Sequence, residues 1–315
     1  PQKSYAETKR PLLDEPPPAP VIAFKPSVLV ADSPRQKLIN AAIDKGVAHL
    51  KSTQWKDGTW PKLAGNTMLP DNYDVGYASL GGLTLLECQA PADDPAVQRA
   101  AAYVRATPLK DTGHRTYQMS CVILFLDRLG DPKDKVLIQS YALQLVAGQT
   151  NRAGWGYECP ELTGGEMHQL LTFLEATRLP VPEVRPPVDK NATDKLDDPV
   201  QPGAKKPAAK PKPAVPPLQT LSRNLAMIPV VHQYYFPKGQ PPRPQAGGLG
   251  GPFDLLMGTD DNSNSQFAML ALWTARRQGV PSERCLVAAA QRYRQTQSAA
   301  DGGWAYQPGF ADNTM

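Results

Sequence analysis

The sequence of 315 residues predicts an all-α protein built from two alternating kinds of helix. Apolar residues recur at helical spacing over residues 34–160 and 259–315, whereas the alternation typical of strands is nearly absent. Nearly apolar segments alternate with amphipathic ones, and a short cluster of Gln, Gly and Trp recurs between them. Because a helix that is apolar on most sides is a buried one, we expect inner helices covered by amphipathic outer helices.

The expected helices follow this alternation in order. Ser33 is expected to cap the first helix and Pro34 to take its first position, and Gly130 is expected to end the fourth. The nearly apolar segments are 73–89, 114–130 and 263–279, and the amphipathic segments are 34–54, 94–106, 131–149 and 281–297.

Composition divides the chain further. Residues 1–33 carry several prolines without an apolar period, so we expect an extended arm before the helices of 34–160. Residues 161–258 interrupt the alternation and are interpreted as an insertion, after which the helices resume over 259–315. Within the insertion, residues 180–217 are rich in Pro, Lys, Ala and Asp, and such a composition predicts disorder.

The overall composition excludes several function classes. A net charge of +4, with scattered basic residues, argues against a nucleic-acid partner. No run of eighteen or more apolar residues is present, so no transmembrane segment is expected. The four cysteines are far apart and have no CxxC spacing, which argues against a disulfide framework. The chain begins with Pro1 rather than Met, which is compatible with export or association with the cell envelope.

The Gln–Gly–Trp clusters are expected to be structural brackets. A catalytic cluster occurs once in a chain, whereas a structural feature recurs with the repeat to which it belongs. The Gln amide can satisfy unpaired groups at helix ends, and the Gly lets the backbone approach the indole ring. The three brackets consist of Gln54, Gly58 and Trp60; of Gln149, Gly154 and Trp155; and of Gln297, Gly302 and Trp304.

The helix alternation and the brackets together resemble the squalene–hopene cyclase and protein prenyltransferase superfamily. The stretch that carries the resemblance best is "DDNSNSQFAMLALWTARRQGVPSERCLVAAAQRYRQTQSAADGGWAYQPG", residues 260–309. It is most similar to the bacterial proteins that contain prenyltransferase/squalene oxidase repeats. The resemblance covers residues 34–160 and 259–315, and it implies an α/α-toroid whose brackets tie neighbouring hairpins together.

The acid motif of the squalene-type cyclases is only partly present. Those enzymes protonate an alkene with an Asp-x-Asp-Asp motif, and the corresponding residues here begin with Gly258 and end with Asp260 and Asp261. A direct alignment of the following helix places the acid instead at Ser263 or Asn264. Asp260 and Asp261 are therefore candidate catalytic acids of a cyclase-like enzyme, and helix capping is the alternative.

The zinc site of the prenyltransferases also has only a weak counterpart. Cys159 and His168, beside Glu158, are the nearest candidate ligands, but their spacing is not that of a known zinc site. We therefore expect no cofactor, and a zinc prenyltransferase-like enzyme remains the third hypothesis.

What remains is a central cavity. The inner helices of a toroid point side chains at a central space, so Tyr77, Tyr117, Gln118 and Gln266 are expected to line it, with packing between helix layers as the alternative. Such walls suit an apolar or isoprenoid-like small molecule or a protein partner. We accordingly expect a binding or scaffold module rather than an enzyme.

The number of hairpins raises a last expectation. A toroid must close, because an open end leaves an apolar face in water. The residues supply three hairpins and one further outer helix. We therefore expect a C-terminal continuation, or a second chain, to complete the ring.

Overall fold

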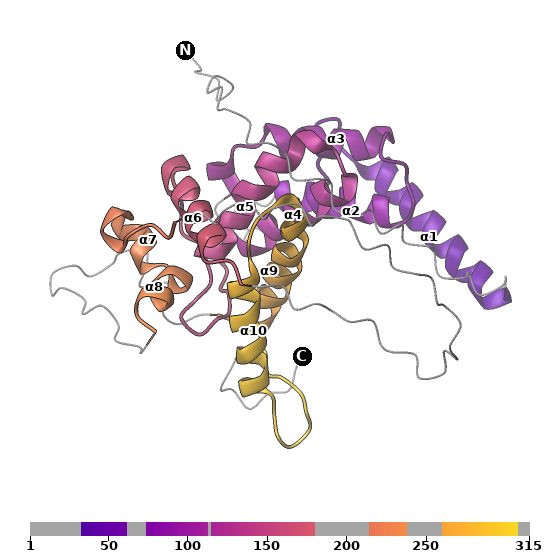
Figure 1. Cartoon of the computed structure of the whole chain (residues 1–315). Coiled ribbons are helices and arrows are strands. Elements are labelled where there is room, and N and C mark those ends of the chain that lie inside the picture. Colours follow the sequence, from indigo (N-terminus) through magenta and orange to yellow (C-terminus); the bar gives the residue numbers. More distant parts are fainter. Residues whose placement is uncertain (1–32, 62–73, 113–114, 180–213, 238–259, 308–315) are drawn as a thin grey trace, which may run out of the picture. The chain divides into compact units, whose positions relative to one another are not determined.

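The fold is entirely helical wherever the structure describes it. The computed structural model describes residues 33–61, 74–112, 115–179, 214–237 and 260–307. These residues form ten α-helices, short 3-10 turns and no strand, which confirms the all-α class (Figure 1). Residue contacts divide the chain into two units, Pro1–Gly46 and Val47–Met315, which are described separately below.

The first unit contributes the first part of helix α1 (Pro34–Thr53). Ser33 Oγ accepts a hydrogen bond from the Gln36 amide at 3.1 Å, so the predicted cap is confirmed. No residue of α1 is buried, and the side chain of Leu38 is 74 % exposed. The amphipathic pattern of this helix therefore does not translate into a buried face. The expected arm, residues 1–33, lies outside the described residues except for Ser33.

In the second unit, the three nearly apolar segments form neighbouring parallel helices. These inner helices are α2 (Asp74–Glu87), α4 (Thr116–Leu129) and α9 (Asn262–Ala275), and α4 contacts both of the others (Figure 1). The first turns of α4 and α9 meet where the Tyr117 hydroxyl donates to Ser263 Oγ at 2.7 Å. The last turns of α4 and α2 meet where Arg128 pairs with Glu87 at 2.8 Å. Because like ends meet, the three helices point the same way.

The segments predicted to be amphipathic form helices that we call outer helices. They are α3 (Pro95–Ala106), α5 (Lys135–Ala147) and α10 (Glu283–Thr296), which pack on α2, α4 and α9 respectively. Helix α5 differs from the prediction because it is buried from Tyr141 to Ala147. Asp94 caps α3, since its side chain accepts the Ala96 amide. Gly130 ends α4 with a φ of 76°, as predicted. Each inner helix thus passes into its outer helix through a short connection.

The three bracket sequences adopt the same local structure. In each, the indole Nε1 of the Trp donates to one of the last four carbonyls of the preceding outer helix, which no backbone amide of that helix can satisfy. The acceptors are Leu50, Leu145 and Tyr293, at 2.9, 2.7 and 2.8 Å. The Gln amide also donates to the carbonyl of its own turn, at Gly58, Ala153 and Gly302. This repeated geometry is what a structural bracket requires.

Two of the brackets also hold a later outer helix. Gln54 Nε2 donates to the Ala96 carbonyl of α3, and Gln149 Nε2 donates to the Cys285 carbonyl of α10, each at 2.9 Å. The approach at Gly58 is close, because a Cβ atom built there would lie 2.2 Å from the Arg99 carbonyl oxygen. These two brackets therefore fix the first turns of α3 and α10.

The predicted insertion leaves and rejoins the helices at one point. The Asp261 amide donates to the Trp155 carbonyl at 3.1 Å, so the residues on either side of the insertion are backbone partners. Between them lie α6 (Gly164–Ala176), α7 (Arg223–Met227) and α8 (Pro229–Tyr235). Residues 180–213, which include most of the segment predicted to be disordered, lie outside the described residues.

The carboxylate of Glu166 joins the two described parts of the insertion. It completes a capping box with Thr163 at the start of α6. It also accepts hydrogen bonds from Ser222 Oγ at 2.9 Å and Asn224 Nδ2 at 3.1 Å, near the start of α7.

None of the helices in the described ranges has the length and hydrophobicity needed to cross a membrane.

Candidate functional site

Each of the three inner helices exposes apolar side chains, and we call these side chains together the inner face. It consists of the exposed or half-buried side chains of Tyr77, Leu80, Leu124, Leu270 and Trp273. Within α2 and α9 these positions are three residues apart, so each helix presents a single stripe. Leu80, Leu270 and Trp273 are 48 %, 49 % and 61 % exposed, and apolar exposure that recurs on several packed helices is typical of a binding surface. The inner face is therefore the strongest candidate for a binding surface.

Hydroxyl groups gather where α4 and α9 begin. Besides the Tyr117–Ser263 hydrogen bond, the hydroxyls of Tyr157 and Tyr306 lie 2.9 Å apart. The Tyr117 ring packs edge-on against Phe267, with 5.1 Å between the ring centroids. Burial raises the pKa of the Tyr117 hydroxyl, so it remains a neutral donor at physiological pH. This end of the inner helices can hydrogen-bond to a polar group.

The opposite end carries a small pocket of about 240 Å³. Leu83 and Leu124 supply apolar walls, and Arg277 pairs with Asp127 beside them. The pocket is lined by Leu83, Glu87, Leu124, Asp127, Arg128, Thr274 and Arg277, which come from all three inner helices and the turn after α9. Since these charges are paired, the pocket offers apolar contact and little net charge.

The structure separates the four predicted cavity residues into two groups. Tyr77 and Gln266 are exposed, and Tyr117 is half-buried at the hydroxyl-rich end. Gln118 is only 2 % exposed and lies against Gly76 of α2. Gln118 therefore packs between α2 and α4, as the alternative expected, and does not reach the inner face.

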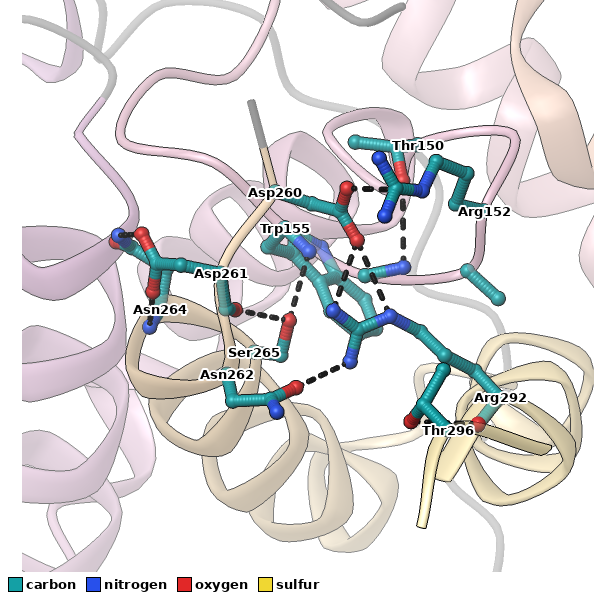
Figure 2. Close-up of polar contacts among 12 residues, drawn as sticks. Thr150, Arg152, Trp155, Asp260, Asp261, Asn262, Asn264, Ser265, Arg292 and Thr296 are labelled. Atoms are coloured by element: carbon teal, nitrogen blue, oxygen red, sulfur yellow. Dashed lines mark hydrogen bonds and ion pairs between the residues drawn. The ribbon is translucent and has the colours of Figure 1, made fainter. Parts of the chain in front are cut away.

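Asp260 lies in a buried ion pair, shown in Figure 2. Its Oδ2 atom is 2.9 Å from Arg292 Nη2 and accepts a hydrogen bond from Arg292 Nε at 3.1 Å. Arg152 Nε lies 3.5 Å from Oδ1, and Arg292 Nη1 donates to Asn262 Oδ1 at 2.6 Å. A Cβ atom built on Gly154 would lie 2.2 Å from Asp260 Oδ2, so the glycine makes room for the pair. These contacts suit a carboxylate that accepts hydrogen bonds, whereas a catalytic acid must donate a proton.

Asp261 has a capping role. Its Oδ1 accepts the backbone amide of Asn264 at 2.6 Å, and its Oδ2 accepts the Asn264 side chain at 2.7 Å. Its carbonyl also accepts a hydrogen bond from Ser265 Oγ at 2.6 Å (Figure 2). Capping, the alternative to acid catalysis, is confirmed for Asp261. Asp260 and Asp261 are sequence neighbours whose side chains serve different partners.

Cys159 and His168 do not form a cluster of metal ligands. No group of three or more His, Cys, Asp or Glu side chains able to hold a metal ion occurs among the described residues. Cys159 is buried with its Sγ 3.5 Å from Thr116 Oγ1, while His168 is exposed. Burial raises the pKa of the Cys159 thiol to about 12, which opposes the thiolate form that binds zinc.

Sequence reasoning missed Arg292 and, apart from Tyr77, the apolar residues of the inner face. Arg292 is 4 % exposed and follows Cys285 and Ala289 on the buried side of α10. An arginine at a core position of an amphipathic helix requires a buried partner, and that signal was present in the sequence. Leu270 and Trp273 gave no such signal, because their exposure depends on which helices pack nearby.

Comparison with known proteins identifies no protein similar to this chain. No protein-family model matches the sequence, and no match was found among curated proteins or among solved structures.

Proposed function

We propose that the chain is a binding module whose inner face takes an apolar, isoprenoid-like small molecule. The observation that carries the proposal is the exposure of Tyr77 and Leu80 on α2 and of Leu270 and Trp273 on α9, two helices that both pack on α4. Burying such side chains contributes roughly 25 cal/mol for each Å² of apolar surface removed from water. An elongated apolar molecule would cover the stripes of several helices at once.

The two ends of the inner face differ in polarity and would therefore orient the bound ligand. The hydroxyl groups of Tyr117 and Ser263 can bind a polar head group, whereas Leu83 and Leu124 in the pocket at the other end offer apolar contact to a tail. A mainly apolar surface with a few polar groups at one end is typical of small-molecule sites. The proposed ligand is therefore amphiphilic, with one hydroxyl or similar group and a hydrocarbon chain.

The experiment is a titration with farnesol, monitored through tryptophan fluorescence. We expect saturable binding that Leu270→Ser and Leu80→Ser each weaken at least fivefold, because both substitutions remove apolar contact. Val287→Ser is the matched control, since Val287 is 47 % exposed but lies on the outer helix α10. Unchanged affinity in both inner-face variants, or equal weakening in the control, would refute the proposal.

The cyclase-like alternative is tested separately. We expect no cyclic product when the purified protein is incubated with squalene, because Asp260 is bound to Arg292 and Asp261 caps α9. Gas chromatography with mass spectrometry detects such products directly. Product formation above a heat-denatured control would replace the binding proposal with catalysis. The zinc alternative predicts stoichiometric metal in the purified protein, which elemental analysis would detect.

A further inference from the structure

The hydroxyl-rich end of the inner face, where α4 and α9 begin, is also rich in aromatic rings. The centroid of the Tyr117 ring lies 6.1 Å from that of Tyr157 and 5.1 Å from that of Phe267. Tyr157 is 50 % exposed, and Tyr117 and Phe267 are half-buried. A ligand group that reaches this end therefore meets aromatic rings as well as hydroxyl groups.

The hydroxyl protons of Tyr117 and Tyr157 are already used within the protein. Tyr117 donates to Ser263 Oγ at 2.7 Å. The Tyr306 hydroxyl lies 2.9 Å from that of Tyr157 and also hydrogen-bonds to the carboxylate of Asp261. Because a carboxylate can only accept, Tyr306 donates to Asp261, and Tyr157 in turn donates to Tyr306. The oxygens of Tyr117 and Tyr157 therefore offer lone pairs, and a ligand must supply the proton of any hydrogen bond to them.

The carboxylate of Asp261 adds a buried negative charge behind these hydroxyls. It is 1 % exposed, and its oxygens accept hydrogen bonds from the backbone and side-chain amides of Asn264 at 2.6 and 2.7 Å. Figure 2 shows that it points toward Asn264, whereas Arg152 and Arg292 face Asp260. Asp261 thus forms no ion pair with any residue that the structure describes.

The charge of Asp261 reaches the hydroxyl groups. Burial is the main cause of the raised pKa of Tyr117 and of Tyr306, and the negative charge of Asp261 raises both pKa values further. Arg115 and Glu158, the charged neighbours of this end in the sequence, lie 3.6 Å apart and offset each other. The unbalanced charge that acts on these hydroxyls is therefore negative, which favours a cation and opposes an anion.

We propose that this end of the inner face binds a primary ammonium group, so that the ligand is an amine with a long apolar chain. The ammonium group donates to the oxygens of Tyr117 and Tyr157, lies against their rings, and is attracted by the charge of Asp261. An ionised carboxylate or phosphate has no proton to donate and would be repelled. This inference rests on the proposed function, because the inner face must hold the hydrocarbon part of the amine.

The experiment compares ligands that share one hydrocarbon chain and differ in the head group. Farnesylamine, farnesol and farnesyl phosphate are each titrated into the full chain at pH 7 and followed by calorimetry. We expect farnesylamine to bind roughly tenfold more tightly than farnesol, and farnesyl phosphate to bind more weakly than either. N-acetylfarnesylamine keeps one N–H but carries no charge, so its affinity should not exceed that of farnesol.

Two variants test the atoms assigned to the ammonium site. Tyr157→Phe removes an acceptor oxygen and keeps the ring, and Tyr306→Phe separates Tyr157 from Asp261 without touching the cap of α9. Each should weaken the binding of farnesylamine about threefold or more, and that of farnesol by less than about twofold, because an alcohol can donate or accept. Tyr234→Phe is the matched control, since Tyr234 is 37 % exposed on α8, outside the inner face. It should leave both affinities unchanged.

The outcomes distinguish this inference from the proposed function. If farnesol or farnesyl phosphate binds as tightly as farnesylamine, or if both tyrosine variants keep the full preference for the amine, the ammonium site is refuted and the inner face remains the binding surface. If none of the farnesyl compounds binds, the proposed function and the ammonium site are both refuted.

Discussion

At the scale of single residues, Asp260 and Arg292 are the most tightly constrained charged pair of the candidate site. Both are nearly excluded from water, and removing one partner would leave the other as a buried, unpaired charge. Such a loss costs far more than the pair itself contributes, since the remaining ion cannot be solvated.

We predict that Asp260→Asn lowers the free energy of unfolding by roughly 3–5 kcal/mol. Urea denaturation followed by circular dichroism measures this change. Glu87→Gln is the control, because the Glu87–Arg128 pair is 59 % and 53 % exposed at its two side chains. Exposed pairs contribute about 0–1 kcal/mol, so equal losses in both variants would contradict a structural role for Asp260.

A substitution at Trp155 tests whether the brackets stabilise the fold. Its side chain is fully buried, and its indole donates to Leu145 at 2.7 Å. Trp155→Ala should cost about 3–5 kcal/mol of stability, the range for truncating a large buried aromatic residue. Trp55, which is 51 % exposed, provides the matched variant, and Trp55→Ala should change stability by less than about 1 kcal/mol. A melting temperature unchanged in Trp155→Ala would show that the bracket is not structural.

At the scale of elements, Glu166 links α6 to α7 and makes this junction sensitive to pH. Burial alone raises the pKa of the Glu166 carboxyl, but hydrogen bonds from Thr163, Ser222 and Asn224 outweigh it and leave the pKa below its usual value. A carboxyl group with a lowered folded-state pKa stabilises the protein above its unfolded pKa. That contribution is lost as the pH falls through the folded-state value.

We therefore predict that Glu166→Gln destabilises the protein most at pH 7. The difference from the wild type should begin to shrink below about pH 4.5, the ordinary pKa of a glutamate carboxyl, and should shrink further as the pH falls through the lower pKa of the folded state. Thermal melts between pH 7 and pH 3 measure this difference. Glu158→Gln is the control, because the Glu158 side chain is 55 % exposed where it pairs with Arg115 and should show little effect at any pH. A constant difference across the pH range would contradict the assigned role of Glu166.

At the scale of the whole molecule, the cysteines report on global unfolding. Cys121, Cys159 and Cys285 are buried free thiols, whereas Cys88 is half-buried just after α2. Burial raises the pKa of Cys121 to about 11 and that of Cys159 and Cys285 to about 12. The reactive species is the thiolate, so both the burial and the raised pKa of these three thiols protect them from modification.

We predict that a thiol reagent at pH 8 modifies one cysteine rapidly in the native protein and all four in urea. The aromatic disulfide reagent DTNB gives this count by absorbance. Cys88→Ser should abolish the rapid phase and leave the three slow groups. Rapid modification of Cys159 or Cys285, identified by mass spectrometry of peptides, would show that the core opens locally.

The sequence by itself determined the helices and their local connections. Helical periodicity, the Ser33 cap and the Gly130 terminus depend on neighbouring residues, and the structure reproduces them. The bracket sequences also produce one recurring geometry, because each Gln, Gly and Trp lies within a single short turn. Local interactions of this kind can be predicted from a sequence because the interacting groups are only a few residues apart.

The tertiary structure alone decided which apolar side chains are exposed and which charges are paired. The segment 73–89 reads as apolar on nearly all sides, yet Leu80 is 48 % exposed because neighbouring helices cover only part of α2. Asp260 and Arg292 meet because the bracket of Gln149, Gly154 and Trp155 brings α10 against the start of α9. Burial and ion pairing depend on distances between segments far apart in the chain, and packing, not local sequence, sets those distances.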